Sequence, residues 1–143
     1  MIRATQGHFE EHYLQFDYEQ VVQWTLEDIK LNLLVYPIPG YRFNQRRPPY
    51  RGTLGVLLCF DCENGLSYWN LLKWRQEVER YCEEECRIVI VETRNDSCQR
   101  VVPEGAGKAM ADLMGVPFCS TSAKSGEGVK QCLEIMAKTV ADI

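Results

Sequence analysis

The stretch TLGVLLCFDC, from Thr53 to Cys62, decides the fold because it is apolar almost throughout. A strand with one wet face alternates apolar and polar residues, whereas a continuous apolar run is typical of a strand buried on both faces in a parallel sheet. Two later runs, RIVIVET at residues 87–93 and PFCSTS at residues 117–122, have the same character. We therefore predict three buried strands that run parallel to one another.

Between and after these strands the apolar residues recur at helical spacing, which predicts helices over residues 67–81, 104–114 and 126–141. Gly115 is expected to end the second helix. The residues predicted to face inward are Leu71, Trp74, Val78 and Tyr81, then Ala106, Met110, Leu113 and Met114, then Val129, Leu133, Met136 and Val140. Strands that alternate with helices indicate an α/β domain, with a mostly parallel sheet flanked by helices.

The N-terminal third predicts a different element, an antiparallel hairpin. Residues 13–26 and 29–37 alternate loosely in polarity, and Glu27-Asp28 forms the turn between them. The proline-rich residues 37–52 then predict a loop, because proline cannot donate in a ladder or continue a helix. We expect a polar N-terminal segment at residues 1–12 and a single domain over residues 13–143.

Composition narrows the class of protein. A chain of 143 residues suits one domain, and its net charge of −4 argues against a nucleic-acid partner. The sequence has no apolar run that predicts a membrane span, no signal-peptide core, and no cysteine near its end for a lipid anchor. We therefore expect a cytoplasmic protein. Its seven cysteines are expected to be reduced thiols, with Cys59, Cys62, Cys119 and Cys132 as small core residues.

The cysteine spacing raises the alternative of a zinc site, from Cys59 and Cys62 together with Cys82 and Cys86. On a strand, residues three positions apart face opposite ways, which separates Cys59 from Cys62. We therefore predict no metal site.

Two long segments resemble Rab-type small GTPases of the Ras superfamily. YRGTLGVLLCFDCENGLSYWNLLKWRQEVERYC, residues 50–82, is similar to the family's segment from the end of switch II through its third helix. GVPFCSTSAKSGEGVKQCLEIMA, residues 115–137, is similar to the family's guanine-specificity loop and final helix. The likeness spans about residues 13–140 and implies a G-domain-like three-layer fold, in which this chain lacks the family's first strand and first helix.

The resemblance implies that guanine would be held by two loops. In the family, backbone N–H groups around a Ser-Ala-Lys motif donate to the guanine carbonyl, and Ser122, Ala123 and Lys124 match that motif. The family's base-reading Asn-Lys-x-Asp corresponds here to residues 93–96: Asp96 is kept and would accept two hydrogen bonds from guanine, and Arg94 would stack on the base. The alternatives are a plain strand-to-helix turn and an exposed polar turn.

The phosphate side of the resemblance is altered. The family's Asp-x-x-Gly-Gln is Pro37-Ile38-Pro39-Gly40-Tyr41 here, so Gly40 would still present an N–H to a phosphate, but the magnesium aspartate and the water-orienting glutamine are replaced. No Gly-x-x-x-x-Gly-Lys motif is present, and residues 8–20 offer no switch I threonine. We therefore expect no catalytic residue, no metal ligand, no hydrolysis, and at most weak binding of GTP or GDP.

These differences leave alternatives open. We expect the gap left by the missing strand to be closed by direct pairing of Leu31–Val35 with Val56–Phe60, or to be filled by N-terminal residues. The chain is then a degenerate Rab-like domain that binds a protein effector or trafficking factor, or the incomplete product of a working GTPase. A remote alternative is a phosphoacceptor receiver domain with Asp61, Thr93 and Lys124 at its strand ends.

Overall fold

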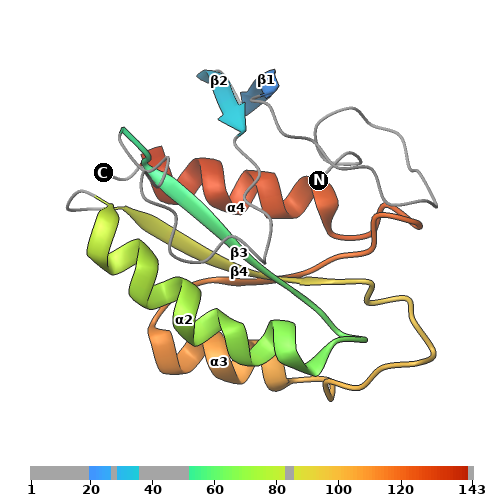
Figure 1. The fold of residues 1–143 in the computed structure, drawn as a ribbon. Coiled ribbons are helices and arrows are strands. Elements are labelled where there is room, and N and C mark those ends of the chain that lie inside the picture. The colour runs from blue at the N-terminus through green and yellow to red at the C-terminus, as the bar shows by residue number, and fades with distance from the viewer. Residues whose placement is uncertain (1–19, 27–28, 36–51, 83–85, 142–143) are drawn as a thin grey trace.

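A computed structural model describes residues 20–26, 29–35, 52–82 and 86–141 of the chain. Two strands, three strand–helix units and their loops follow one another in the order that the sequence predicts (Figure 1). The elements are β1 (Gln20–Leu26), β2 (Ile29–Val35), β3 (Gly55–Asp61), α2 (Gly65–Tyr81), β4 (Arg87–Thr93), α3 (Ala106–Met114), β5 (Phe118–Ser120) and α4 (Val129–Ala141). The predicted α/β class is confirmed. Residues 1–12 lie outside the described ranges, so the division at residue 12 stays a prediction.

The strands form two separate sheets. In the larger one the order is β3-β4-β5 and both pairings are parallel, with Cys59, Val91 and Cys119 in one row across the three strands. The smaller one is the antiparallel β1–β2 hairpin, which confirms the predicted hairpin. Among the described residues no ladder joins the two sheets, so the expected pairing of Leu31–Val35 with Val56–Phe60 is wrong. Each of these strands instead matches its full length to another partner, β2 to β1 and β3 to β4.

Helices cover the parallel sheet on both faces, which gives three layers (Figure 1). On one side α2 and α3 enclose a core cluster with the sheet, in which Phe60 and Ile90 are the most deeply buried strand residues. On the other side α4 packs its Cys132 and Met136 against Val89, Val91 and Cys119. Successive residues of β4 belong to opposite clusters, as the pleat of a strand buried on both faces requires.

The helix ends explain where the expected boundaries shift. The side chain of Asn64 caps α2 by accepting from the Ser67 N–H at 3.2 Å. Gly115, at φ +69°, ends α3 as predicted. Helix α4 begins at Val129 rather than at 126, because Gly126 and Gly128 both have positive φ and no helix passes through that conformation.

Three expectations about the core are wrong. Tyr81 was predicted to face inward near the end of α2 but is 40% exposed. Leu113 was predicted to face inward but is 80% exposed, because α3 buries Ala111 in its place, beside the correctly predicted Met110 and Met114. Cys59 was predicted to lie in the core but is exposed on β3, the outer strand of the described sheet. All seven cysteines are described and free. None of the described helices combines the length and the apolarity needed to cross a membrane.

Candidate functional site

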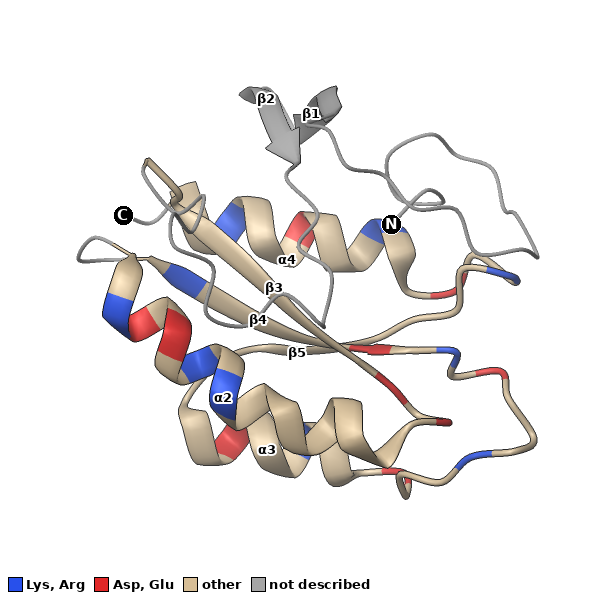
Figure 2. Ribbon diagram, viewed as in Figure 1, with Lys and Arg blue, Asp and Glu red and all other residues tan. Residues whose placement is uncertain are grey.

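The candidate site lies at the carboxyl ends of the parallel strands, where β3 ends at Asp61, β4 at Thr93 and β5 at Ser120. Figure 2 shows that the loops leaving this end of the sheet contain both acidic and basic residues. In open α/β sheets this edge is where ligands bind. The loops that follow β4 and β5 carry most of the residues predicted from the resemblance.

Asp96 and Ser122 lie in contact across these two loops. The Ser122 hydroxyl donates to a carboxylate oxygen of Asp96 at 2.6 Å, and Ser122 is fully buried. This bond, together with the positive charge of Lys124 and Arg94, lowers the pKa of Asp96 below its usual range. The structure thus brings the predicted residues Arg94, Asp96, Ser122 and Lys124 to the same end of the sheet. The lowered pKa keeps the Asp96 carboxyl ionised, as a hydrogen-bond acceptor.

The loop after β5 is fixed by its own backbone. The Ser122 N–H donates to the Glu127 carbonyl at 2.9 Å, and the Gly126 N–H donates back to the Ser122 carbonyl at 2.8 Å. Gly128 has φ +72°, and a Cβ there would lie 2.1 Å from the Ser120 carbonyl oxygen, so only glycine fits. Ala123 is half-buried and Lys124 exposed on this rigid turn.

Arg94 is engaged differently from the expectation. Its backbone has φ +58°, and its guanidinium forms ion pairs with Asp61, at 3.4 Å, and with Glu63. Glu63 also accepts from the Ser97 hydroxyl at 2.7 Å, and that bond together with Arg94 lowers its pKa. The side chain that was expected to stack on a base is therefore turned toward β3.

A buried polar network lies beneath the two loops, and the sequence reading missed it. Glu92 is 5% exposed within β4, and it pairs with Arg100 and accepts from the Ser120 hydroxyl at 2.7 Å. Ser120 in turn accepts from the Asn95 side-chain N–H at 3.1 Å. The signal was present in RIVIVET, because a carboxylate in an otherwise apolar strand must find a partner if it is buried.

Other predicted residues have plain structural roles or are not described. Gly40 lies outside the described residues. The Thr93 hydroxyl donates to the Phe60 carbonyl at 3.1 Å, between neighbouring strands. Asp61 accepts from the Glu63 N–H at 2.9 Å, as a turn residue does. These contacts account for Asp61 and Thr93 without a phosphoacceptor role.

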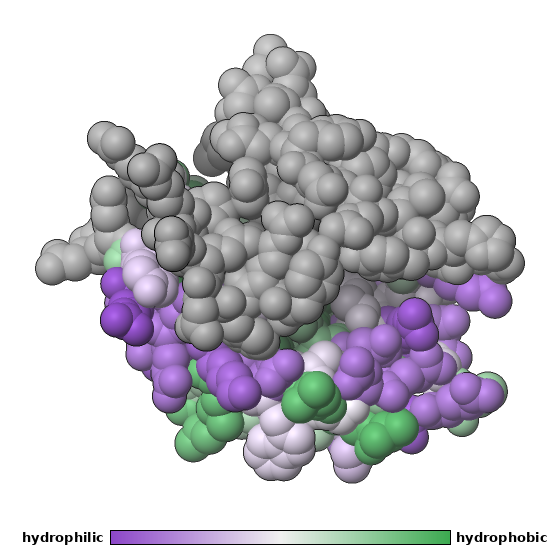
Figure 3. Space-filling model, viewed as in Figure 1, coloured by the Kyte–Doolittle hydropathy of each residue, from purple (hydrophilic) through white to green (hydrophobic). Residues whose placement is uncertain are grey.

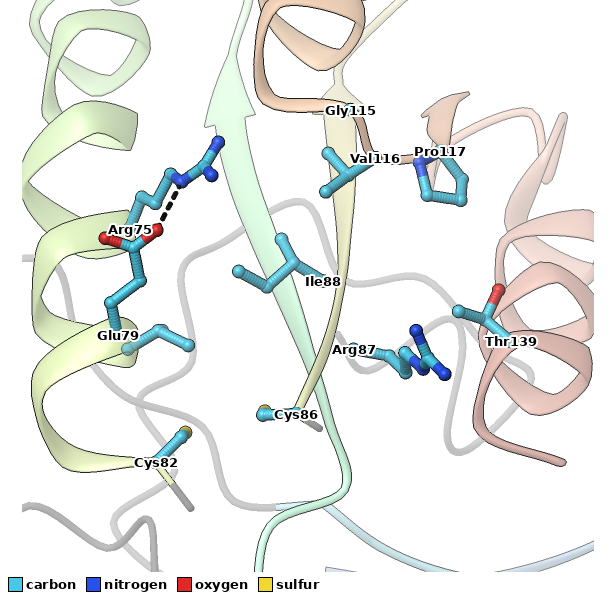
Figure 4. Close-up of a pocket in the computed structure, with 11 residues that line it drawn as sticks. Arg75, Glu79, Cys82, Cys86, Arg87, Ile88, Gly115, Val116, Pro117 and Thr139 are labelled. Carbon is cyan, nitrogen blue, oxygen red and sulfur yellow. Dashed lines mark hydrogen bonds and ion pairs between the residues drawn. The ribbon is translucent and has the colours of Figure 1, made fainter. Parts of the chain in front are cut away.

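A hollow of about 430 Å³ lies at the opposite end of the sheet, away from the loop site (Figure 4). The ends of α2, α3 and α4 and the start of β4 surround it, and Cys82 and Cys86 line it. Burial and the Cys86 thiol raise the pKa of Cys82 to about 12, so this sulfur stays protonated near neutral pH and is a poor zinc ligand. No group of three or more metal-binding side chains gathers anywhere in the described ranges.

Cys59 and Cys62, the other half of the imagined zinc site, point to different surroundings. Cys62 is fully buried, and its thiol donates to the Arg94 carbonyl at 3.1 Å. Cys59 is exposed. The two sulfurs therefore do not share a site, as the strand geometry predicted.

Comparison with known proteins decides the family. A family model described as the Ras family matches residues 1–142 of the chain. This chain belongs to the Ras family. The Rab resemblance seen in the sequence is confirmed by its curated relatives.

Three of these relatives are similar over comparable lengths. "GTP-binding protein YPTM2" of Zea mays is 34% identical over 94 residues, which are 65% of this chain and 46% of that protein. "Ras-related protein Rab-1D" of Dictyostelium discoideum is 34% identical over 92 residues, 64% of this chain and 45% of that protein. "Ras-related protein SEC4" of Saccharomyces cerevisiae is 29% identical over 93 residues, 65% and 43%. The aligned part of this Ras-family chain thus spans less than half the length of the curated relatives it matches.

Membership of the Ras family relates the loop site to a known part of the fold. The Asp96 and Ser122 loops occupy the strand ends of a partial G domain with a parallel sheet, as the resemblance implies. The receiver-domain alternative loses its support, because the match to the Ras family extends over nearly the whole chain.

Proposed function

We propose that this chain is a Rab-like domain that binds GTP or GDP weakly or not at all and acts as a protein-interaction module in vesicle and membrane traffic. The observation that supports the proposal is the contact between Asp96 and Ser122, at 2.6 Å, because it ties the two guanine-side loops together through the chain's own side chains. The loops that would contact guanine are ordered, whereas the residues that would contact phosphate are altered. This combination favours a role in binding other proteins over a role as a GTP-dependent switch.

The phosphate side limits nucleotide affinity. Phosphoryl recognition in this class of protein depends on magnesium, on a lysine and on backbone N–H groups. At residues 37–41 the sequence PIPGY supplies Gly40 but neither a carboxylate nor a glutamine. Each charge-assisted hydrogen bond contributes about 1.5–3 kcal/mol, so the loss of several leaves a base clamp of roughly millimolar affinity. We expect no hydrolysis.

The base side limits affinity as well. The pKa of Asp96 is lowered by Ser122 and Lys124, so we expect its ionised carboxylate to accept from guanine N–H groups. Arg94, however, is held by Asp61 and Glu63. These pairs turn Arg94 toward β3, so we expect a base held by Asp96 to gain little from stacking on it.

The proposal names a class of partner. We infer a protein effector or trafficking factor, with no nucleic-acid partner because the net charge is −4, and we place the protein in the cytoplasm. The alternative, an incomplete product of a working Rab GTPase, is favoured by the short match to its relatives. Substitutions at Pro37, Tyr41 and Thr93 favour degeneration, since truncation alone would leave those motifs unchanged.

The test is a nucleotide analysis of the purified chain. The protein is denatured, and the supernatant is separated to detect guanine nucleotide, while the native protein is titrated with GDP and magnesium by calorimetry. We expect no stoichiometric nucleotide and a dissociation constant in the millimolar range or no binding. Asp96→Ala is the matched control, because it removes the base acceptor and should abolish any weak binding. Sub-micromolar GDP affinity, or co-purified GDP, would overturn the proposal.

A further inference from the structure

The outer face of α2 carries an unusual apolar stripe. Leu66 is 67% exposed, Trp69 63% and Leu72 40%, and they recur every three residues along the helix. No charged residue occurs between positions 64 and 72. An exposed helix face is normally polar, so this stripe of Leu66, Trp69 and Leu72, here called the α2 stripe, needs an explanation.

Neighbouring elements extend the stripe. Val101, in the loop after β4, is 64% exposed and lies beside the first residue of α2. One of its methyl carbons is 3.9 Å from the position that a Cβ on Gly65 would take. Leu113 is 80% exposed on α3, next in sequence to Met114, whose carbonyl accepts from the Arg75 side chain at 3.2 Å. Figure 3 shows green side chains gathered along the edge of the surface formed by α2 and α3.

Trp69 is held in place before any partner arrives. The Tyr68 hydroxyl donates to the Ala106 carbonyl at 3.0 Å, which fixes the Tyr68 ring against α3. The Trp69 ring meets the Tyr68 ring edge to face, with 5.3 Å between centroids. An exposed tryptophan in a fixed orientation is typical of an interface anchor, because little side-chain freedom is lost on binding.

We propose that the α2 stripe is the contact surface for a second copy of this chain, related by a two-fold axis beside Trp69. The order Leu66, Trp69, Leu72 reads the same in both directions with equal spacing. An antiparallel contact between two copies therefore places Trp69 against Trp69 and each Leu66 against the Leu72 of the other copy. Such self-complementarity is what an isologous dimer interface requires.

The charges beside the stripe fit the same arrangement. Asp61 and Glu63 precede α2, and with Arg94 bound between them the group keeps one net negative charge. After the stripe, α2 holds Lys73, Arg75 and Arg80 against Glu77 and Glu79, with Arg75 paired to Glu79 at 2.9 Å, so this end has a net charge of +1. An antiparallel contact brings the net negative end of one copy toward the net positive end of the other, which favours this orientation over a parallel one.

The available area sets the expected strength. The three stripe residues with Val101 and Leu113 expose an apolar area on the order of 500 Å². Two such surfaces bury about 1,000 Å² in total, which is near the lower limit of specific interfaces. The dimer should therefore be weak and reversible, with a dissociation constant of roughly 10–100 µM.

The test is sedimentation velocity of the whole chain under reducing conditions, from about 1 µM to about 500 µM, a range that brackets the expected constant. We expect monomer at the low end and mostly dimer at the high end. Trp69→Glu should stay monomeric throughout, with an unchanged circular dichroism spectrum. Leu54→Glu is the matched control, because Leu54 is 57% exposed but precedes β3 and is not part of the α2 stripe, so this variant should dimerise like the wild type.

A pair of charged variants tests the antiparallel pairing directly. Leu66→Asp and Leu72→Lys should each weaken self-association at least tenfold. Mixed together, they should associate more tightly than either does alone, because Asp at position 66 of one copy faces Lys at position 72 of the other. A wild type that is monomeric at the highest concentration, a dimer that survives Trp69→Glu, or a mixture no tighter than its components would each overturn the proposal.

Discussion

Ser122 donates its hydroxyl proton to Asp96 across 2.6 Å, although the two residues stand 26 positions apart in the sequence. The bond ties the loop after β5 to the loop after β4 and leaves the Asp96 carboxyl ionised. Ser122 also accepts from the Ser125 N–H at 3.1 Å, so one buried hydroxyl serves both loops. The integrity of the guanine-side loops depends on this residue more than on the exposed Lys124.

Replacing Ser122 with alanine should destabilise the domain. The change leaves the Ser125 N–H without its acceptor and removes the donor to Asp96, so we expect a loss of about 1–3 kcal/mol in the free energy of unfolding. Urea denaturation monitored by circular dichroism gives the value. Ser125→Ala is the control: its exposed hydroxyl only accepts from the Glu127 N–H, at 3.2 Å, and its loss should cost less than about 0.5 kcal/mol. Equal losses in the two variants would contradict the prediction.

The lowered pKa of Asp96 predicts a specific acid sensitivity. Because this pKa is lower in the folded than in the unfolded state, ionised Asp96 stabilises the fold above the ordinary aspartate pKa of about 4, and that contribution disappears as the pH falls toward the folded-state value. Asp96→Asn lacks this titration. The wild type should therefore lose stability faster than Asp96→Asn as the pH falls below about 4, in urea midpoints measured at each pH. Parallel curves for the two proteins would show that Asp96 does not titrate in this way.

Gly128→Ala should be among the most damaging small substitutions in the loop after β5. The residue has φ +72°, and the added Cβ would lie 2.1 Å from the Ser120 carbonyl oxygen, so backbone and loop must both shift. We expect a loss of more than about 2 kcal/mol in the free energy of unfolding. Gly105→Ala separates the two causes: Gly105 has φ +86°, but a Cβ added there would meet no atom within 4 Å, so the change should cost only about 1 kcal/mol. If Gly105→Ala cost as much, steric contact with Ser120 would not be the reason.

The fold was predictable wherever a run of residues had one period. Residues 53–62 and 87–93 identify buried strands through apolar continuity, and the structure forms β3 and β4 within them. The inward face of α3 was less predictable, because Leu113 fits a helical stripe as well as Met110 does. A small rotation of the helix about its axis decides which of its apolar residues meet the sheet. In the structure the small Ala111 faces the sheet and Leu113 faces outward. Which strand pairs with β2 and which with β3 was not predictable from the pattern of apolar residues, because strand pairing depends on the path of the whole chain.

The candidate site, like the fold, was only partly predictable from the sequence. Asp96, Ser122, Ala123 and Lys124 were predicted from the resemblance, and the structure places their loops at strand ends that a parallel sheet brings together. The engagement of Arg94 with Asp61 and Glu63 was missed, since its partners lie more than thirty positions away. The local spacing of residues does not predict ion pairs between positions so far apart. A carboxylate inside an apolar strand, such as Glu92, does predict that it has a partner, because an unpaired buried charge is costly.

The buried pair of Glu92 and Arg100 gives the sharpest test of that reasoning. Their side chains are 7% and 17% exposed, so Arg100→Met leaves an uncompensated carboxylate beneath the loops and should cost about 3–5 kcal/mol. Lys108→Met breaks the pair of Lys108 with Asp112, whose side chains are 61% and 62% exposed, and should cost at most about 1 kcal/mol. Replacing both partners, Glu92→Leu with Arg100→Met, removes the unpaired charge, so the double variant should be more stable than Arg100→Met alone. Urea denaturation of the four proteins beside the wild type measures this coupling. If the losses from Glu92→Leu and Arg100→Met simply add, the ion pair does not hold the network together.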